Sequence, residues 1–240
     1  KDGIMPGYFG YEAGQSCVGD HFAWFVENCV PESYEQEARV RGISIHQLLS
    51  EKLSTYKAGA SGLLALDWFN GVRTPLMDFN LNGLIMGMNL LTKPEEIYLS
   101  LIEATAYGTR MIIEGFEEAG LEVKDITLSG GIPIKNEMLV QVYSDVCNRK
   151  IKVVDSTQSS ALGAAILGAA AAPERITGFK NANEAAKKLG KVKDKVWEPN
   201  QDNVEIYNEL YEEYKTLHTY FGTGINDVMK HLNNIRERRK

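Results

Sequence analysis

The sequence predicts an α/β protein in which helices flank a mixed sheet. Short apolar segments typical of strands alternate with longer amphipathic segments typical of helices. One strand, residues 125–129, ends in Gly130-Gly131 and leads into a helix, and at such a corner backbone N–H groups can approach a ligand without interference from a Cβ atom. A helix made mainly of Ala and Gly, residues 159–172, can pack closely on its neighbours, and we expect it in the core.

The first part of the chain is expected to be irregular and then helical. Five glycines between Gly3 and Gly19 disfavour regular structure there. From Asp20 onward apolar residues recur at helical spacing up to position 28, and Asp20 is the candidate N-cap of this helix. The next elements we expect are helices over residues 32–40 and 44–57 and strands over residues 63–66 and 84–88.

The longest periodic segment covers residues 94–120. Pro94 suits the first helical turn, and the two glutamates after it complement the positive end of the helix dipole. Further on we expect a helix over 136–147, a strand over 151–154 and charged amphipathic helices over 183–189, 203–220 and 226–238. The chain is therefore divided into a domain of residues 1–173 and an appended helical tail of residues 174–240 packed on the same domain.

Composition narrows the classes of function. A formal net charge of −6 argues against general nucleic-acid binding. No apolar run approaches the roughly 18–20 residues that a bilayer-spanning helix needs. The three scattered cysteines suit a reducing compartment, where each is expected to be a small buried apolar residue. These features, with no secretory signal in view, predict a soluble cytoplasmic protein that binds neither nucleic acid nor membrane.

The common signatures for nucleotides, metals and acyl transfer are missing. The chain has no G-x-x-x-x-G-K-[ST] loop and no G-x-G-x-x-G segment opening a helix. Its four histidines are far apart and no C-x-x-C occurs, so no metal site is expected. The chain also has no G-x-S-x-G elbow, so no serine is identified as the nucleophile of a hydrolase triad.

Several motifs nevertheless occur in the order found in one known family. They are Gly-Val-Arg-Thr-Pro at 71–75, the pair of segments 83–88 and 96–103, Ser-Gly-Gly-Ile-Pro-Ile-Lys-Asn at 129–136, and Gln-Ser-Ser-Ala-Leu-Gly-Ala-Ala at 158–165. Together they resemble the carboxy-terminal domain of the FGGY-type carbohydrate kinases, although Leu101 departs from the residues usual in the second motif. Within that family, residues 7–16 and 66–71 are most similar to the L-ribulokinases.

The resemblance implies an actin-like (ribonuclease H-like) ATPase fold. In this family two domains close on ATP and sugar, and the chain is similar to the second of them. The family's two phosphate loops and its catalytic Asp would lie in an N-terminal domain before Lys1. We therefore expect the chain to be a fragment of a longer protein, to require that missing domain as its partner, and to contain no catalytic residue.

The resemblance also implies a set of nucleotide-binding residues. Gly131 and Lys135 match positions that meet the adenosine moiety, while Gly130 shapes the turn and Asn136 caps the next helix. A second pair, Gly19 and Ala23, lies just before and inside the helix around Trp24 and matches positions that touch the nucleotide in related kinases. The complete set is Gly19, Ala23, Gly130, Gly131, Lys135 and Asn136.

Glu12 matches a carboxylate that lies near the sugar in ribulokinases, and an ordinary solvated loop glutamate is the alternative left open. Arg73 is expected to form a structural ion pair rather than a phosphate clamp. By resemblance, the whole protein would use ATP and Mg²⁺ to convert L-ribulose to L-ribulose 5-phosphate in arabinose catabolism. A xylulokinase-like or glycerol-kinase-like enzyme and a non-catalytic actin-like structural or oligomerisation module stay open as alternatives, as do the exact sugar and the formation of a homo-oligomer.

Overall fold

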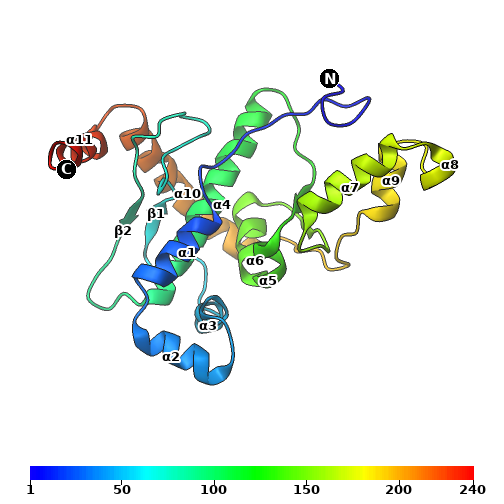
Figure 1. Ribbon diagram of the computed structural model, residues 1–240. Coiled ribbons are helices and arrows are strands. Elements are labelled where there is room, and N and C mark those ends of the chain that lie inside the picture. Colours follow the sequence, from blue (N-terminus) through cyan, green and yellow to red (C-terminus); the bar gives the residue numbers. More distant parts are fainter.

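The long helix α4 (Pro94–Glu118) is the central element of the chain, whose computed structural model describes residues 1–240 (Figure 1). α4 begins as the sequence predicts, with Pro94 in the first turn and the backbone N–H of Lys93 donating to the Glu96 carboxylate at 2.7 Å. Every residue from Tyr98 to Gly108 is buried. This part of α4 is therefore enclosed on all sides, and other elements pack around it.

The strands form two separate two-stranded sheets. β1 (Leu64–Leu66) pairs antiparallel with β2 (Leu84–Met86), and β3 (Ile126–Leu128) pairs in parallel with β4 (Ile151–Val153). The parallel pair is connected through α5 (Gly131–Lys135) and α6 (Glu137–Cys147), which makes a βαβ unit. One parallel and one antiparallel ladder agree with the predicted mixed pairing, but they do not join into one continuous sheet.

Helix α10 (Gln201–Gly222) contributes to the same core as α4. It lies against β1 and α6, and its residues Tyr207, Tyr211 and Tyr214 are buried in the apolar cluster that also contains Tyr107 of α4. Residues beyond position 173 thus supply side chains to the centre of the molecule. The division of the chain at Pro173 stays a prediction.

Three helices near the N-terminus pack on the start of α4. They are α1 (Gly19–Asn28), α2 (Glu32–Arg41) and α3 (Ile45–Lys52). α1 buries Phe22 and Phe25, and α3 buries Leu48 and Leu49. The predicted N-cap of α1 is wrong, because Val18 occupies the cap position and Asp20 lies inside the first turn without a capping hydrogen bond.

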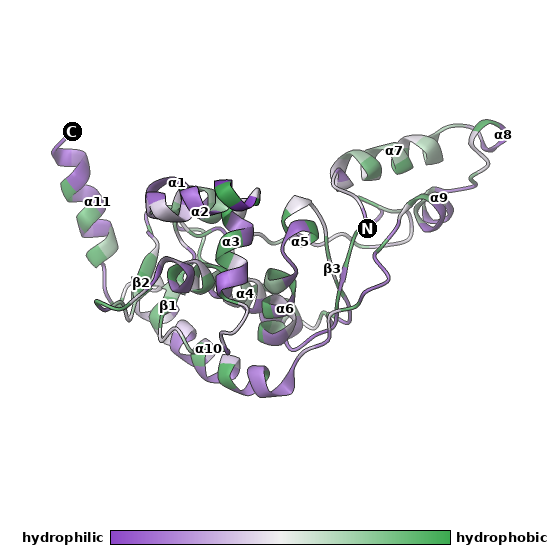
Figure 2. Cartoon of the chain, turned by 90° about the horizontal axis from the view of Figure 1, so that it is seen from below, coloured by the Kyte–Doolittle hydropathy of each residue, from purple (hydrophilic) through white to green (hydrophobic).

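The small-residue helix α7 (Ser159–Ala171) is a second correction. Only Ile166 of this helix is buried, so the prediction that it belongs to the core is wrong in this chain. α7 packs with α8 (Glu174–Thr177) and α9 (Ala182–Leu189) in an arm that extends from the main body (Figure 2). Its main contacts are with α8 and α9 and not with α4, and the apolar composition of a helix does not show which neighbours it packs on.

The last helix, α11 (Val228–Arg238), extends from the opposite side of the body (Figure 2). It is attached through Met229, which is buried, and through Lys230, whose ammonium lies 2.9 Å from the Asp78 carboxylate. None of the helices combines the length and the apolar character needed to cross a lipid bilayer.

Two buried acids tie α10 to the rest of the core. The Tyr214 hydroxyl lies 2.8 Å from the carboxylate of Asp67, which follows β1, and the Tyr207 hydroxyl lies 3.1 Å from the Glu103 carboxyl of α4. The Cβ of any residue other than glycine at position 108 would lie 2.8 Å from Asp67 Oδ2, so Gly108 permits this close approach. Burial raises the pKa of Glu103 to about 8, and the hydrogen bond with Tyr207 opposes that rise.

We predict that Glu103→Gln makes the thermal stability less dependent on pH. The folded-state pKa of Glu103 lies above its unfolded value, so the stability associated with the protonated acid is present at low pH and is lost as pH rises toward about 8. Gln keeps the shape and cannot ionise, which should benefit the folded state by on the order of a few kcal/mol at pH 8–9. Melting temperatures measured from pH 5 to pH 9 test this.

The control is Glu122→Gln, which changes an exposed carboxylate paired with Lys124. Its melting curve should follow that of the unchanged chain at every pH. Parallel melting profiles for Glu103→Gln and the unchanged chain would contradict the account of Glu103.

Candidate functional site

The corner formed by Gly130 and Gly131, here called the glycine corner, connects β3 to α5. Gly130 has φ 97° and ψ −176°, a backbone conformation that is essentially restricted to glycine. Its N–H donates to the Ser159 hydroxyl at 3.2 Å, which attaches the corner to the first turn of α7. A Cβ placed at Gly130 or at Gly131 would meet no atom within 4 Å, so the corner faces open space.

A cavity of about 730 Å³ lies next to this corner, and we call it the α3 cavity. Residues of five helices line it. One wall is the first half of α1, with Gly19, Phe22 and Ala23, and the floor includes Tyr98 of α4. The second wall is α5 and the start of α6, from Ile132 to Met138, and the third is the polar side of α3. Its volume falls within the range of about 300–1,000 Å³ typical of small-molecule sites.

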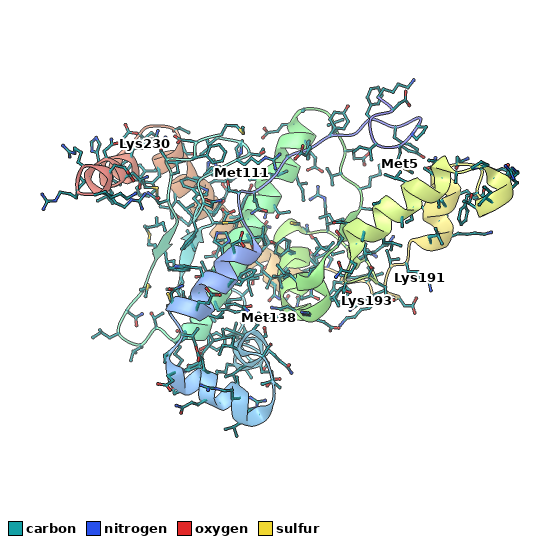
Figure 3. The ribbon with its side chains drawn as sticks, viewed as in Figure 1. Met5, Met111, Met138, Lys191, Lys193 and Lys230 are labelled. Carbon is teal, nitrogen blue, oxygen red and sulfur yellow. The ribbon has the colours of Figure 1, made fainter.

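Four of the six predicted nucleotide-binding residues line this one cavity. They come from segments more than 100 positions apart in the chain: Gly19, Ala23, Lys135 and Asn136. The glycine corner lies just outside the lining and is joined to it by Ile132, which follows Gly131 directly. Figure 3 labels Met138, another lining residue, between α1 and α6. The fold therefore brings together two motifs that the sequence kept separate.

Asn136 has the local role that the sequence predicts. Its side-chain oxygen accepts the N–H of Leu139 at 3.1 Å and thereby caps α6. It also lines the α3 cavity together with the buried Tyr98. Burial raises the pKa of Tyr98 to about 12, and the Asn136 side chain opposes that rise.

His46 of α3 is held against the same phenol. Its Nδ1 lies 3.1 Å from the Tyr98 oxygen, and its ring centroid lies 5.8 Å from that of Tyr98. Burial, and after it the positive charge of Lys135, lowers the pKa of His46 below its ordinary value. The imidazole is therefore neutral at pH 7, which suits hydrogen bonding to an uncharged part of a ligand.

Sequence reasoning missed the α3 wall. The face of α3 that contacts the cavity has small or polar side chains at helical spacing, and the opposite face packs on the core through Leu48, Leu49 and Leu53. Such an amphipathic pattern normally means that the polar face meets solvent, and nothing in the pattern showed that another wall lies opposite. The wall residues are Ser44, His46, Gln47, Ser50, Glu51 and Ser54.

A polar network connects this wall to α2. Gln47 donates from Nε2 to Glu51 at 3.0 Å, and Arg41 forms an ion pair with the other oxygen of Glu51. The hydrogen bond from Gln47, followed by the contact with Arg41, lowers the pKa of Glu51. Glu51 is therefore ionised at pH 7 and can only accept, so the Gln47 amide nitrogen must point toward it.

Glu12 lies away from the α3 cavity, in the exposed segment before α1. It forms an ion pair with Arg73, whose guanidinium also packs beside Gly14. This pairing agrees with the expectation that Arg73 has a structural role. The side chain of Glu12 is 75% exposed, so part of its carboxylate stays accessible to a ligand.

No group of three or more His, Cys, Asp or Glu side chains is arranged to hold a metal ion in residues 1–240.

A family model described as the FGGY family of carbohydrate kinases, C-terminal domain, matches residues 1–172. The chain belongs to this family. It is 53% identical over 236 residues to a ribulokinase of Bacillus licheniformis. This alignment covers 98% of this chain and 43% of the relative. It is 52% identical over 237 residues to a ribulokinase of Anoxybacillus flavithermus, with coverage of 99% and 42%. The chain thus spans about two-fifths of the length of these curated relatives.

Solved structures confirm the fold class. The xylulose kinase from Rhodospirillum rubrum superimposes with a TM-score of 0.66 at 22% identity, over 85% of this chain and 38% of that chain. The actin-like α/β fold predicted from the motifs is therefore correct. At this level of identity the likeness concerns the fold alone.

We predict that Gly130→Ala destabilises the chain by about 1–3 kcal/mol, because alanine is strained at the backbone angles of this corner. No clash contributes, since the space around the position is open. Chemical denaturation gives the free energy of unfolding. Gly131→Ala is the matched control, because position 131 is the first residue of α5 and has ordinary helical geometry, and it should stay within about 0.5 kcal/mol. Equal losses for both variants would contradict this account of the corner.

Proposed function

We propose that this chain is the ATP-binding half of a sugar kinase whose whole polypeptide transfers the γ-phosphate of ATP to L-ribulose and forms L-ribulose 5-phosphate. The observation that supports this most strongly is the α3 cavity, which gathers Gly19, Ala23, Lys135 and Asn136 beside the open glycine corner. The ribulokinase relatives, similar over nearly the entire chain, support the choice of sugar. The reaction would serve arabinose catabolism.

The residues present fit a nucleotide. The lining of the cavity combines the aromatic rings of Phe22 and Tyr98 with polar side chains of α3, a combination that suits a base and ribose. The Lys135 side chain is exposed at the cavity and provides a positive charge toward an anionic ligand. The glycine corner leaves space for a chain of phosphates to leave the cavity without meeting side chains.

Bound ATP would supply the phosphoryl group, and Mg²⁺ would neutralise charge on its phosphates. The contribution of this chain is to hold one side of the nucleotide in a fixed position. Positioning the reactants can account for roughly 7–11 kcal/mol of barrier lowering, and a general base adds about 10²–10⁴-fold in rate. We propose that the base belongs to the remainder of the longer protein.

Glu12 is the proposed contact to the sugar. Its ion pair with Arg73 leaves it largely exposed but fixes its direction. A carboxylate in that position can accept hydrogen bonds from sugar hydroxyls.

The exposed helix α7 is the proposed contact to the rest of the longer protein. Its surface is mainly apolar and consists mostly of Ala and Gly, with Leu167 also exposed, and the small residues allow a second backbone to approach closely. Its first turn is linked to the glycine corner through Ser159. A domain packed on α7 would therefore be mechanically connected to the nucleotide.

We place the whole protein in the cytoplasm. All three cysteines are unpaired thiols, as expected in a reducing compartment. Cys17 and Cys147 are buried as predicted, whereas Cys29 is exposed and corrects that part of the prediction.

We predict that Gly131→Leu in the full-length kinase weakens binding of Mg-ATP by about tenfold or more while the melting temperature of the free protein stays unchanged. The added side chain would extend into space that is empty of protein atoms, and a bound phosphate chain would lose that space. Isothermal titration calorimetry measures the affinity. Gly115→Leu, at a helical glycine with open space around it on α4, is the control and should bind Mg-ATP normally.

We also predict that the full-length protein phosphorylates L-ribulose with a higher kcat/KM than D-xylulose or glycerol, and that the purified 240-residue chain phosphorylates none of them. A coupled assay for ADP release measures both. A preference for xylulose or glycerol would contradict the proposed substrate. Turnover by the 240-residue chain, shown to be folded by circular dichroism, would contradict the proposal that the base lies elsewhere.

A further inference from the structure

We propose that α3 reads the purine base of the nucleotide, with His46 donating a hydrogen bond to N7 of adenine and Gln47 accepting one from its 6-amino group. This inference rests on the proposed binding of ATP and adds to it the residues that select the base. Both side chains line the α3 cavity, and neither lies in the short sequence motifs that resemble those of the family.

The hydrogen-bond chain beneath His46 determines which ring nitrogen carries its proton. The Tyr98 side chain is 2% exposed, and the one hydrogen bond of its hydroxyl within the protein is the contact with His46 Nδ1. The hydroxyl proton of Tyr98 is then available to donate to His46 Nδ1, at 3.1 Å. A neutral imidazole that accepts at Nδ1 must carry its proton on Nε2.

His46 Nε2 has no hydrogen-bond partner in the protein, although the residue is half-buried and lines the cavity. It is therefore a fixed donor that lacks an acceptor. Fixed donors of this kind give specificity, because the ordering of the side chain has already occurred before the ligand binds.

Gln47 is oriented by a separate set of contacts. The ionised Glu51, held by Arg41, requires the amide nitrogen of Gln47 to face it, and the backbone N–H of Gln47 is bound to the Ser44 hydroxyl at 3.1 Å. The Gln47 Oε1 atom is therefore turned away from Glu51 and has no partner in the protein. It is an exposed acceptor, oriented by the contact with Glu51, that has no donor within the protein.

A donor and an acceptor on one wall match adenine better than the other purines. Along one edge adenine presents N7 as an acceptor beside a 6-amino donor, whereas guanine presents two acceptors, N7 and O6. Hypoxanthine shares the O6 acceptor with guanine. An oxygen at position 6 would face the Gln47 oxygen without a proton between them, which leaves two acceptors unsatisfied.

The experiment pairs two variants with two altered nucleotides in the full-length kinase. Affinities are measured by calorimetry for Mg-ADP, Mg-7-deaza-ADP, which lacks the N7 acceptor, and Mg-IDP, which has an oxygen in place of the amino group. His46→Phe should lower the affinity for Mg-ADP by about 3- to 10-fold and leave the affinity for Mg-7-deaza-ADP unchanged. Gln47→Met should lower the affinity for Mg-ADP by a similar factor. Its affinity for Mg-IDP should be unchanged or higher.

Matched controls exist on the same chain. Gln36 of α2 donates to Glu32 at 3.1 Å as Gln47 does to Glu51, but it lies outside the cavity, and His231 is exposed on α11. Gln36→Met and His231→Phe should bind all three nucleotides normally. Inorganic tripolyphosphate, which lacks a base, should bind the four variants equally, and their melting temperatures establish that each is folded.

The two proposals fail in different ways. If the unchanged kinase binds no Mg-ADP, the proposed function is wrong and this inference falls with it. The inference alone is overturned if the kinase binds Mg-ADP and both His46→Phe and Gln47→Met bind it equally well. It is also overturned if each variant loses the same factor in affinity for Mg-ADP and for its altered nucleotide, Mg-7-deaza-ADP or Mg-IDP. In either case the base is recognised by other residues.

Discussion

The arrangement of the α3 cavity depends on the buried phenol of Tyr98. This side chain is 2% exposed and belongs to the enclosed part of α4. The ring of Phe22 from α1 packs on it with a centroid separation of 5.4 Å, His46 from α3 meets its oxygen, and Asn136 from the α5–α6 junction lines the same cavity and moderates the rise of its pKa. One side chain thus positions three walls that are distant in the sequence. A buried hydroxyl without these partners would be costly, so the walls and the phenol stabilise one another.

Much of the local structure could be predicted from the sequence, because it depends on local chemistry. Pro94 and Glu96 determine where α4 begins, and the two glycines at 130–131 determine how β3 turns into α5. The predictions that proved wrong depended on tertiary context. Asp20 is chemically a good cap but lies two residues after the cap position at Val18. α7 is apolar yet exposed, because composition does not reveal which neighbour covers a helix.

The site was predictable to the extent that motifs mark it. The glycine corner and Lys135 belong to one motif. Gly19 lies near them because α1 packs on the Ile132 side chain, and a Cβ added at Gly19 would lie 3.0 Å from that side chain. The α3 wall has no motif. Its serines, His46 and Gln47 are ordinary residues for a solvated helix face. The orientation of His46 and Gln47 depends on their contacts with Tyr98 and Glu51, which the motifs do not include.

The central claim is that the walls of the α3 cavity, built around Tyr98, enclose the nucleotide of a sugar kinase. Amide hydrogen exchange in the full-length protein, with and without saturating Mg-ADP, tests it most directly. The account predicts slower exchange on binding at residues 19–24, 44–54 and 130–138, with little change in α11. Slower exchange elsewhere in the chain, with these three segments unaffected, would contradict it.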